Sequence, residues 1–242
     1  MSVDKDVILN TLQKGEIQLQ GQFLNGSNYT FMSEVHLEER ILPAVYKPLR
    51  GEQPLWDFPQ GTLCKREVAA YEFSELLGWE LVPLTVYRRK GPLGAGSLQY
   101  FIECDAEYHY FKFSEEDRAR LRPVALFDVL INNADRKGGH ILKEIADGHL
   151  WLIDHGICFH VEDKLRTVVW DFAGEPLPAD LLSDLCLLIQ REEQEQMLTR
   201  RLENLLRASE INTLLSRARR LVDQGVFPTP LGSRRSYPWP PV

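Results

Sequence analysis

The hydrophobic periodicity of the chain changes part-way along its length, and this change restricts the fold more than any other feature. The first part contains short β-rich runs separated by glycine and proline, namely EIQLQGQFL, NYTFMSEV, ILPAVYKPL, ELVPLTVYR and SLQYFIE. Between residues 179 and 224 the apolar residues recur instead at helical spacing, and Gly225 follows as a helix stop. Strands followed by helices predict an α+β fold.

A helix interrupts the strand-rich part. In CKREVAAYEFSELLG, the residues Ala69, Phe73 and Leu76 form one apolar stripe, and Gly78 is suited to end the helix. The strand-rich part therefore has one helix of its own, which is expected to pack its apolar face on neighbouring elements.

The pattern changes again near FIECDAEYHY, which we take as the joint between two lobes. Residues 1–105 are predicted to form a β-rich N-lobe with one helix, and residues 106–226 a mostly helical C-lobe. Residues 227–242 are rich in proline and are predicted to form an extended tail. A cleft between two such lobes is a common place for a ligand.

Composition excludes some classes of function. The net charge of -7 argues against a nucleic-acid-binding surface and against an anchor on anionic membranes. No run of about 18 uncharged apolar residues occurs, and the N-terminal segment contains acids, so neither a membrane span nor secretion is expected. The cysteines stand singly, without CxxC spacing, which indicates reduced thiols. We therefore expect a cytoplasmic protein.

Lys47 and Glu67 are candidates for a phosphate-binding pair. In PAVYKPLRG, Val45 and Lys47 share one face of a strand, and Pro48 favours an extended backbone at the lysine. A lysine that faces a cleft can hold a phosphate and be held by an acid, for which Glu67 in the first turn of the next helix is the candidate. Each residue also has an ordinary explanation, as a solvent-facing strand lysine and as an acid favoured by the helix macrodipole.

The stretch GQFLNGSNYTF predicts a tight hairpin, because Asn25 and Gly26 lie between two strand-like runs and tolerate positive φ. The same loop is a candidate phosphate cover, in which Gly26, Ser27 and Asn28 offer small side chains and backbone N–H groups to an anion. The sequence leaves both interpretations open.

Asp135 is the candidate catalytic acid or base. The stretch RPVALFDVLINNADRKGGHIL begins as an amphipathic helix and breaks at NNADR, which places Asp135 at the start of a glycine-containing loop. A carboxylate there can accept a proton from an attacking hydroxyl, while Arg136 and Lys137 are placed to offset phosphate charge. The alternative is an ordinary turn aspartate.

Asp154 is the candidate metal ligand. Residues 150–153 are apolar, as expected of a buried strand, and Asp154 follows at the strand exit, where an acid is costly unless it is paired or bound to a metal. His140 is a possible second ligand. His149 and His155 are expected to be surface or hydrogen-bonded histidines, because no HExxH or paired-cysteine spacing supports a zinc site.

These candidates occur in the order found in protein-kinase-like phosphotransferases. The segments FDVLINNADRKGGHIL and LIDHGICF resemble the catalytic and metal-binding segments of the phosphatidylinositol 3- and 4-kinase superfamily, especially type II phosphatidylinositol 4-kinases, and more distantly those of HipA-like kinases. The whole chain, including KREVAAYEFSELLGW, VVWDFAGEPLP and YPWPPV, resembles a family of uncharacterised bacterial proteins distantly related to those lipid kinases. The kinase resemblance covers residues 21–160.

The resemblance implies a two-lobed protein-kinase-like fold with a reduced C-lobe, and ATP with Mg²⁺ or Mn²⁺ as cofactors. Lys47 is then expected to hold the α and β phosphates with Glu67 as its partner, Asp135 to be the catalytic aspartate, and Asp154 to bind metal. The adenine is expected to contact the backbone of the segment between the lobes, formed by Phe101, Ile102, Glu103 and Cys104.

One residue departs from the kinase pattern. The kinases have asparagine five residues after the catalytic aspartate, and this chain has His140, whose imidazole nitrogen suits softer metals than magnesium. Three functions stay open at this point: an ATP- and metal-dependent phosphotransferase with an unknown acceptor, a nucleotide-binding pseudokinase that regulates a partner, and a transferase that moves AMP. The oligomeric state is not predicted.

Overall fold

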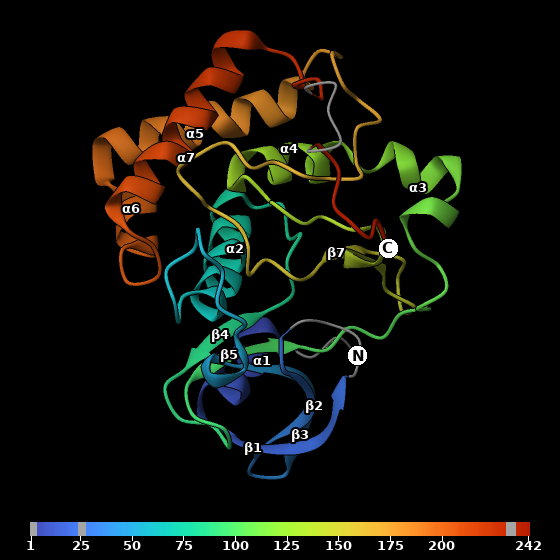
Figure 1. The fold of residues 1–242 in the computed structure, drawn as a ribbon, viewed down its shortest axis with the longest axis vertical. Coiled ribbons are helices and arrows are strands. Elements are labelled where there is room, and N and C mark those ends of the chain that lie inside the picture. The colour runs from blue at the N-terminus through green and yellow to red at the C-terminus, as the bar shows by residue number, and fades with distance from the viewer. Residues whose placement is uncertain (1–3, 24–27, 231–235) are drawn as a thin grey trace.

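The computed structural model describes residues 4–23, 28–230 and 236–242. A β-sheet lies at one end of the long axis of the molecule, and helices α5 (Ala179–Glu195), α6 (Met197–Leu202) and α7 (Ala208–Gln224) lie at the other (Figure 1). The predicted α+β class and the two-lobed, kinase-like arrangement are confirmed.

The sheet is antiparallel and has the strand order β1-β2-β3-β5-β4. The five predicted β-rich runs each contain one strand: β1 (Glu16–Phe23), β2 (Thr30–Leu37), β3 (Arg40–Pro48), β4 (Thr85–Arg88) and β5 (Gly96–Tyr100). Burial alternates along β3, so Ala44 and Tyr46 face the core of the sheet while Val45 and Lys47 share the opposite face, as the spacing predicts.

A helix that the sequence analysis did not identify covers the face of the sheet that carries Ala44 and Tyr46. Helix α1 (Lys5–Lys14) is capped by Asp4, whose side chain accepts the N–H of Asp6. Its residues Ile8 and Leu12 pack into a core that is distinct from that of the helical half, together with Ile17, Val35, Leu42, Ala44, Tyr46, Val86 and Leu98. The sheet and α1 thus form a unit with a core of its own.

Helix α2 (Leu63–Leu77) ends at Gly78 in the left-handed conformation, as predicted. Because the helix begins at Leu63, Glu67 lies in its second turn and not in the first, so the macrodipole does not explain this acid. The apolar side chains of α2 belong to the core of the helical half, where Phe73 stacks on Phe127 with ring centroids 5.8 Å apart. Helix α2 also contacts β4 and β5, so it lies between the two halves.

The helical half begins with α3 (Glu115–Ala119) and α4 (Arg122–Ile131). A short hairpin of β6 (Ile141–Lys143) and β7 (Leu150–Leu152) follows, and then α5 (Ala179–Glu195), α6 (Met197–Leu202) and α7 (Ala208–Gln224). Three 3₁₀ turns complete the described elements: η1 (Leu49–Gly51), η2 (Tyr110–Lys112) and η3 (Gly138–His140). Gly225 ends α7 at φ 65°, as expected.

The C-terminal segment packs against the helical half through its backbone. The Ser236 carbonyl accepts the N–H of Thr167 and the indole N–H of Trp170, and the Pro241 carbonyl accepts the N–H of Gly138 at 2.8 Å. The described end of the tail therefore lies along the loop that follows Asp135.

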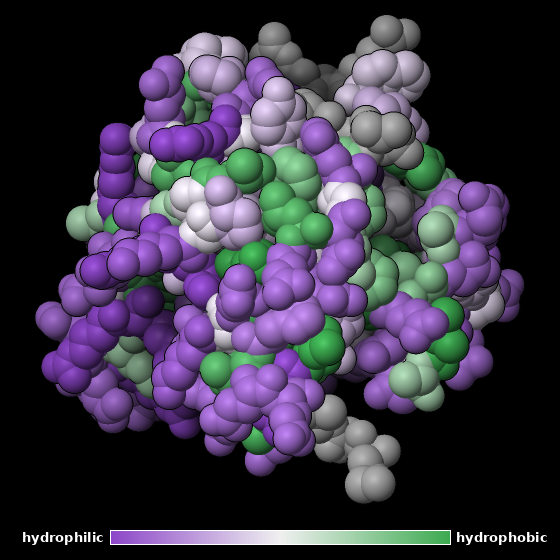
Figure 2. Space-filling model, turned by 90° about the horizontal axis from the view of Figure 1, so that it is seen from below, coloured by the Kyte–Doolittle hydropathy of each residue, from purple (hydrophilic) through white to green (hydrophobic). Residues whose placement is uncertain are grey.

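The surface at the sheet end is mostly hydrophilic, with small groups of hydrophobic residues among the polar ones (Figure 2). Within the described residues, no helix combines the length and the apolar character that crossing a membrane requires. All four cysteines are free thiols, as predicted.

Candidate active site

Lys47 joins the two halves of the molecule. Its Nζ lies 2.5 Å from Oε1 of Glu67 on α2 and 2.8 Å from Oδ1 of Asp154, which directly follows the β6–β7 hairpin. Burial disfavours the charged ammonium, but the two carboxylates outweigh this effect and raise the pKa of Lys47 above its ordinary value. The lysine therefore stays charged, as a group that holds phosphate must.

Glu67 is held from two sides. Its side chain is 4% exposed, and while Oε1 accepts from Lys47, Oε2 accepts the backbone N–H of His155 at 2.9 Å. A buried carboxylate with both oxygens hydrogen-bonded keeps its position. Glu67 thus fixes Lys47 relative to the segment that contains Asp154.

Asp154 has the left-handed backbone conformation, with φ 65°. This conformation turns the chain sharply as it leaves the hairpin, and the side chain stays half exposed. The charge of Lys47 holds the pKa of Asp154 far below its usual range, and His140 acts in the same direction. The strand before it alternates in burial, Leu150 and Leu152 being buried and Trp151 and Ile153 half-buried, so the expectation of a continuously buried run was wrong.

His140 ends η3 and faces Asp154. Its Nδ1 lies 3.5 Å from the backbone nitrogen of Lys137, and its Nε2 lies 3.3 Å from Oδ2 of Asp154. Burial lowers the pKa of His140 to about 4, although Asp154 acts in the opposite direction. The ring is therefore neutral at physiological pH.

Asp135 lies in the loop after α4, which ends with Asn132 in the left-handed conformation. The N–H of Asp135 is bonded to Oδ1 of Asn133, and its carboxylate lies 3.5 Å from Nζ of Lys137. Burial raises the pKa of Asp135 to about 6, against the opposing charge of Lys137. This carboxyl group gains and loses its proton close to neutral pH, as a general base does.

Arg136 does not lie where the sequence analysis placed it. We expected this arginine to offset phosphate charge, but its side chain is fully buried and bonded to Asp128, with Nε 3.0 Å from Oδ1. It also donates to the carbonyl of Ile153 at 2.9 Å and to Nε2 of His155 at 2.8 Å. Arg136 thus connects the loop of Asp135 to the segment of Asp154 from the inside, and of the two cations only Lys137 stays beside Asp135.

The sequence analysis also missed Asp128, which accepts from Arg136, from the amide of Asn133 and from the hydroxyl of Thr167. An aspartate in the otherwise apolar stretch of α4 was the available signal, since a buried acid requires partners. His155 and His149 are hydrogen-bonded, as expected, and the carbonyl that His149 contacts is that of Glu80.

The residues predicted to contact nucleotide are only partly described. Gly26 and Ser27 lie outside the described residues, and Oδ1 of Asn28 accepts the N–H of Gln53 at 2.7 Å.

In the segment between the lobes, Phe101 donates its N–H to Pro43, and Glu103 accepts the N–H of Ile145. Cys104 forms a bridge with Glu144. Ile102 is 5% exposed, and within the described part of the chain its N–H has no hydrogen-bond partner. Within the same described residues, the N–H groups of Glu103 and Cys104 also donate to no partner, so residues 102–104 have backbone donors left for a ligand.

The donor atoms fit a divalent ion that is shared with a phosphate. Nε2 of His140 and Oδ2 of Asp154 are 3.3 Å apart, close to the roughly 3 Å between adjacent ligands of an octahedral ion. No group of three or more histidines, cysteines or acids among the described residues is arranged to hold a metal alone. Mg²⁺ is usually bound through one or two carboxylates and the phosphates of a substrate, so this small set of donors suits it.

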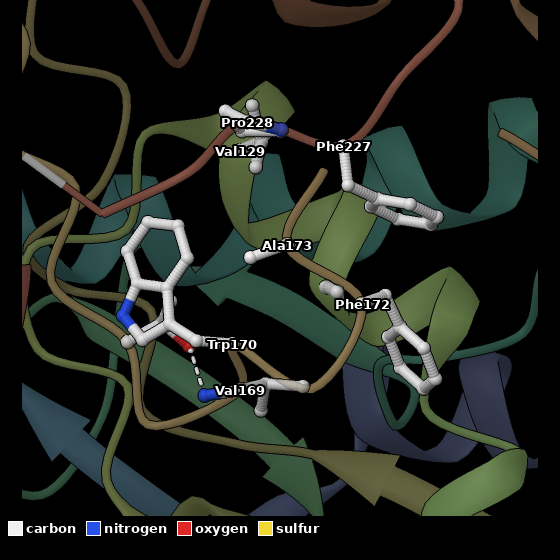
Figure 3. Close-up of a pocket in the computed structure, with 9 residues that line it drawn as sticks. Val129, Val169, Trp170, Phe172, Ala173, Phe227 and Pro228 are labelled. Atoms are coloured by element: carbon white, nitrogen blue, oxygen red, sulfur yellow. Dashed lines mark hydrogen bonds between the residues drawn. The ribbon is translucent and has the colours of Figure 1, made fainter. Parts of the chain in front are cut away.

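A concave region is lined by residues other than Lys47 and Asp154. An apolar pocket is formed by Val129 of α4, by Val169, Trp170, Phe172 and Ala173, and by Phe227 and Pro228 (Figure 3). Its lining includes none of the candidate site residues.

A model of a known protein family matches this chain. The model for "Phosphatidylinositol 3- and 4-kinase" matches residues 76–218, which is more than half of the chain. The chain belongs to the phosphatidylinositol 3- and 4-kinase family. The match reaches into α7, well past the segments that suggested the resemblance. Lys47 and Glu67 precede residue 76, so their roles depend on the geometry described above.

Two individual proteins are similar to this chain in sequence. Protein Rv2133c of Mycobacterium tuberculosis (strain ATCC 25618 / H37Rv) is 41% identical over a 264-position alignment that covers 95% of this chain and 93% of that protein. Phosphatidylinositol 4-kinase gamma 4 of Oryza sativa subsp. japonica is 26% identical over 205 residues, which cover 69% of this chain and 36% of that protein. This chain thus spans only about a third of the plant kinase.

The fold is also that of a solved kinase. The crystal structure of the Helicobacter pylori proinflammatory kinase CtkA matches with a TM-score of 0.54 at 12% sequence identity, over 89% of this chain and 94% of that chain. At an identity this low, the structural match shows a shared fold and nothing more. Together with the family match, it places the chain in the kinase-like phosphotransferase superfamily.

Proposed function

We propose that this member of the phosphatidylinositol 3- and 4-kinase family is an ATP- and divalent-metal-dependent phosphotransferase. The observation that carries the proposal is the position of Lys47 of the sheet, whose ammonium is held between Glu67 of α2 and Asp154 after the β6–β7 hairpin. A charged lysine held between two acids at a lobe boundary is what the binding of nucleotide phosphates requires.

The other residues have complementary roles. On nucleotide binding, Lys47 exchanges Asp154 for the α and β phosphates and keeps Glu67 as its partner. Asp154 and His140 would hold Mg²⁺ or Mn²⁺, and the ion would supply charge neutralisation for the transferred phosphoryl group. The backbone N–H groups of Ile102, Glu103 and Cys104 are the candidate contacts for adenine.

Asp135 is the candidate base for the acceptor hydroxyl. Its pKa of about 6 makes it mostly ionised at neutral pH, yet basic enough to accept a proton. Lys137 beside it balances the charge of the incoming phosphoryl group. Catalysis then depends mainly on positioning and on charge neutralisation.

A nucleotide-binding module without transfer is the second candidate. The contact of His140 with Asp154 favours it, because that contact occupies an oxygen that a metal ion needs. Binding of ATP that does not require a metal, with no product, would distinguish this function from the first.

The test combines binding and product formation. Thermal unfolding is followed with ATP and either Mg²⁺ or Mn²⁺, since a ligand selective for the folded state raises its stability. Products are then identified by mass spectrometry, which separates phosphoryl transfer from AMP transfer. Asp135→Asn is expected to abolish product but not binding, whereas Asp147→Asn, in an exposed turn, is the matched control. Absence of stabilisation by any nucleotide rejects the proposal.

A further inference from the structure

Arg66, the neighbour of Glu67 in α2, is a buried arginine with several partners. Its side chain is 1% exposed and forms a short ion pair with Glu210 of α7. Its Nη1 donates to the carbonyl of Cys158 at 2.5 Å, and the guanidinium lies 4.9 Å from the ring centroid of Phe58. The arginine therefore reaches from α2 into the helical half.

Glu210 is equally well satisfied. It lies in the first turn of α7, where a negative charge is favoured, and its second oxygen accepts the N–H of Arg207 at 2.8 Å. Removing two charges from water is costly, and a buried ion pair is therefore weak evidence for stability. What the pair does provide is a directional link between α2 and α7.

This link matters because the partners of Lys47 come from one half of the molecule. Lys47 belongs to the sheet, whose core is separate, whereas α2 contributes to the core of the helical half together with the hairpin before Asp154. A shift of α2 moves Glu67 away from Lys47. Arg66 is the residue next to Glu67, so fixing one within a helical turn fixes the other.

We propose that the Arg66–Glu210 ion pair is a positioning device for the active site, which holds Glu67 in place against Lys47 without an activating partner or a modified segment. The inference deepens the proposed function and rests on it. Arg66 and Glu210 act through Glu67 and do not themselves contact nucleotide.

The test is a double-mutant cycle between Arg66→Lys and Glu67→Gln. The readout is ADP release from Mn²⁺–ATP by the full chain, with water or the chain itself as acceptor. Arg66→Lys is expected to lower kcat about tenfold, with a smaller change in KM. In the Glu67→Gln background, the same substitution is expected to change kcat by less than about twofold, because the placement of residue 67 no longer matters.

Two further variants separate positioning from stability. Arg217→Lys alters another buried arginine, whose hydrogen-bond acceptors, the carbonyls of Leu130 and His160, lie outside α2, so it is expected to lower stability but leave kcat nearly unchanged. Glu210→Gln keeps an acceptor for the N–H of Arg207 and replaces Arg66→Lys if that variant does not fold.

The outcomes are distinct. An unchanged kcat in Arg66→Lys, or an equal loss of kcat in both backgrounds, overturns the positioning role while the proposed function stands. A wild-type chain that neither binds Mn²⁺–ATP nor releases ADP overturns the proposed function, and this inference with it.

Discussion

Nζ of Lys47 lies 2.8 Å from Oδ1 of Asp154, although 107 residues separate the two in the chain. The contact closes the boundary between the sheet and the helical half, and Glu67 completes it from α2. Both aspartates proposed for function, Asp135 and Asp154, follow the ends of regular elements, where the backbone can turn side chains towards the same space.

Replacement of Lys47 tests the centre of this arrangement. Lys47→Met leaves the carboxylates of Glu67 and Asp154 facing each other without a cation, and it removes the charge that holds phosphate. We expect loss of the nucleotide-dependent thermal shift and at least a roughly 100-fold fall in ADP release. Lys14→Met, at the exposed end of α1, is the control and is expected to behave like the wild type. Equal activity of both variants would contradict the role of Lys47.

The raised pKa of Asp135 predicts opposite effects on activity and stability. A carboxyl group whose pKa in the folded state is raised, here to about 6, stabilises the fold at pH values below its unfolded value near 4, and this contribution is lost as the pH rises through 6. Asp135→Asn keeps the neutral form at every pH. We expect it to be about 1 to 2 kcal/mol more stable than the wild type at pH 7.5 and nearly equal at pH 4.

Urea unfolding at the two pH values measures this difference in stability. The pH dependence of product formation measures the effect of Asp135 on activity. Product formation by the wild type is expected to rise as the pH passes 6, because ionised Asp135 is the base. Asp147→Asn controls for the loss of one charge. A variant that is less stable than the wild type at pH 7.5 rejects the explanation.

His140→Asn tests the metal preference. An amide oxygen is a hard ligand that suits Mg²⁺, whereas the imidazole suits softer ions. The variant is expected to shift the ratio of the apparent Kd values for Mg²⁺–ATP and Mn²⁺–ATP by roughly tenfold in favour of magnesium, or about 1.4 kcal/mol. Titration by thermal shift gives both values. His149→Asn, on the hairpin, is the matched control, and an unchanged ratio in His140→Asn means that His140 does not contact the ion.

Removal of Arg136 tests the buried network beneath the site. Arg136→Met leaves Asp128 buried without its cation, which is expected to cost about 3 to 5 kcal/mol in the free energy of unfolding. Replacing both residues, as in Arg136→Met with Asp128→Leu, is expected to recover most of that loss. Urea unfolding measures both variants. If Arg136 acted on phosphate, as first expected, the single variant would lose activity and keep its stability.

Truncation tests the C-terminal segment. Deletion of residues 236–242 removes the carbonyls of Ser236 and Pro241, which accept hydrogen bonds from Thr167, Trp170 and Gly138. The expected loss of stability is about 2 to 3 kcal/mol, from net contributions near 1 kcal/mol for each bond. The midpoint of urea unfolding of the truncated chain measures this loss of stability. Deletion of Val242 alone, whose side chain is exposed, should leave the midpoint unchanged.

Local patterns in the sequence predicted much of this protein. The alternation in β3 placed Lys47 on the face opposite the buried residues, and the glycines after α2 and α7 marked where those helices end. The break after α4 placed Asp135 in a loop. These features depend on side-chain periodicity and on backbone conformations that a few neighbouring residues impose, so the chain specifies them by itself.

Tertiary structure decided what those residues contact. Nothing near Arg136 in the sequence shows that it turns inwards to Asp128, or that α2 joins the core of the helical half and is tied to α7 by Arg66 and Glu210. The same holds for the contact of His140 with Asp154. Whether a charge is buried and which partner it finds depend on segments that meet only when the chain has folded, because burial and pairing are properties of the packed whole.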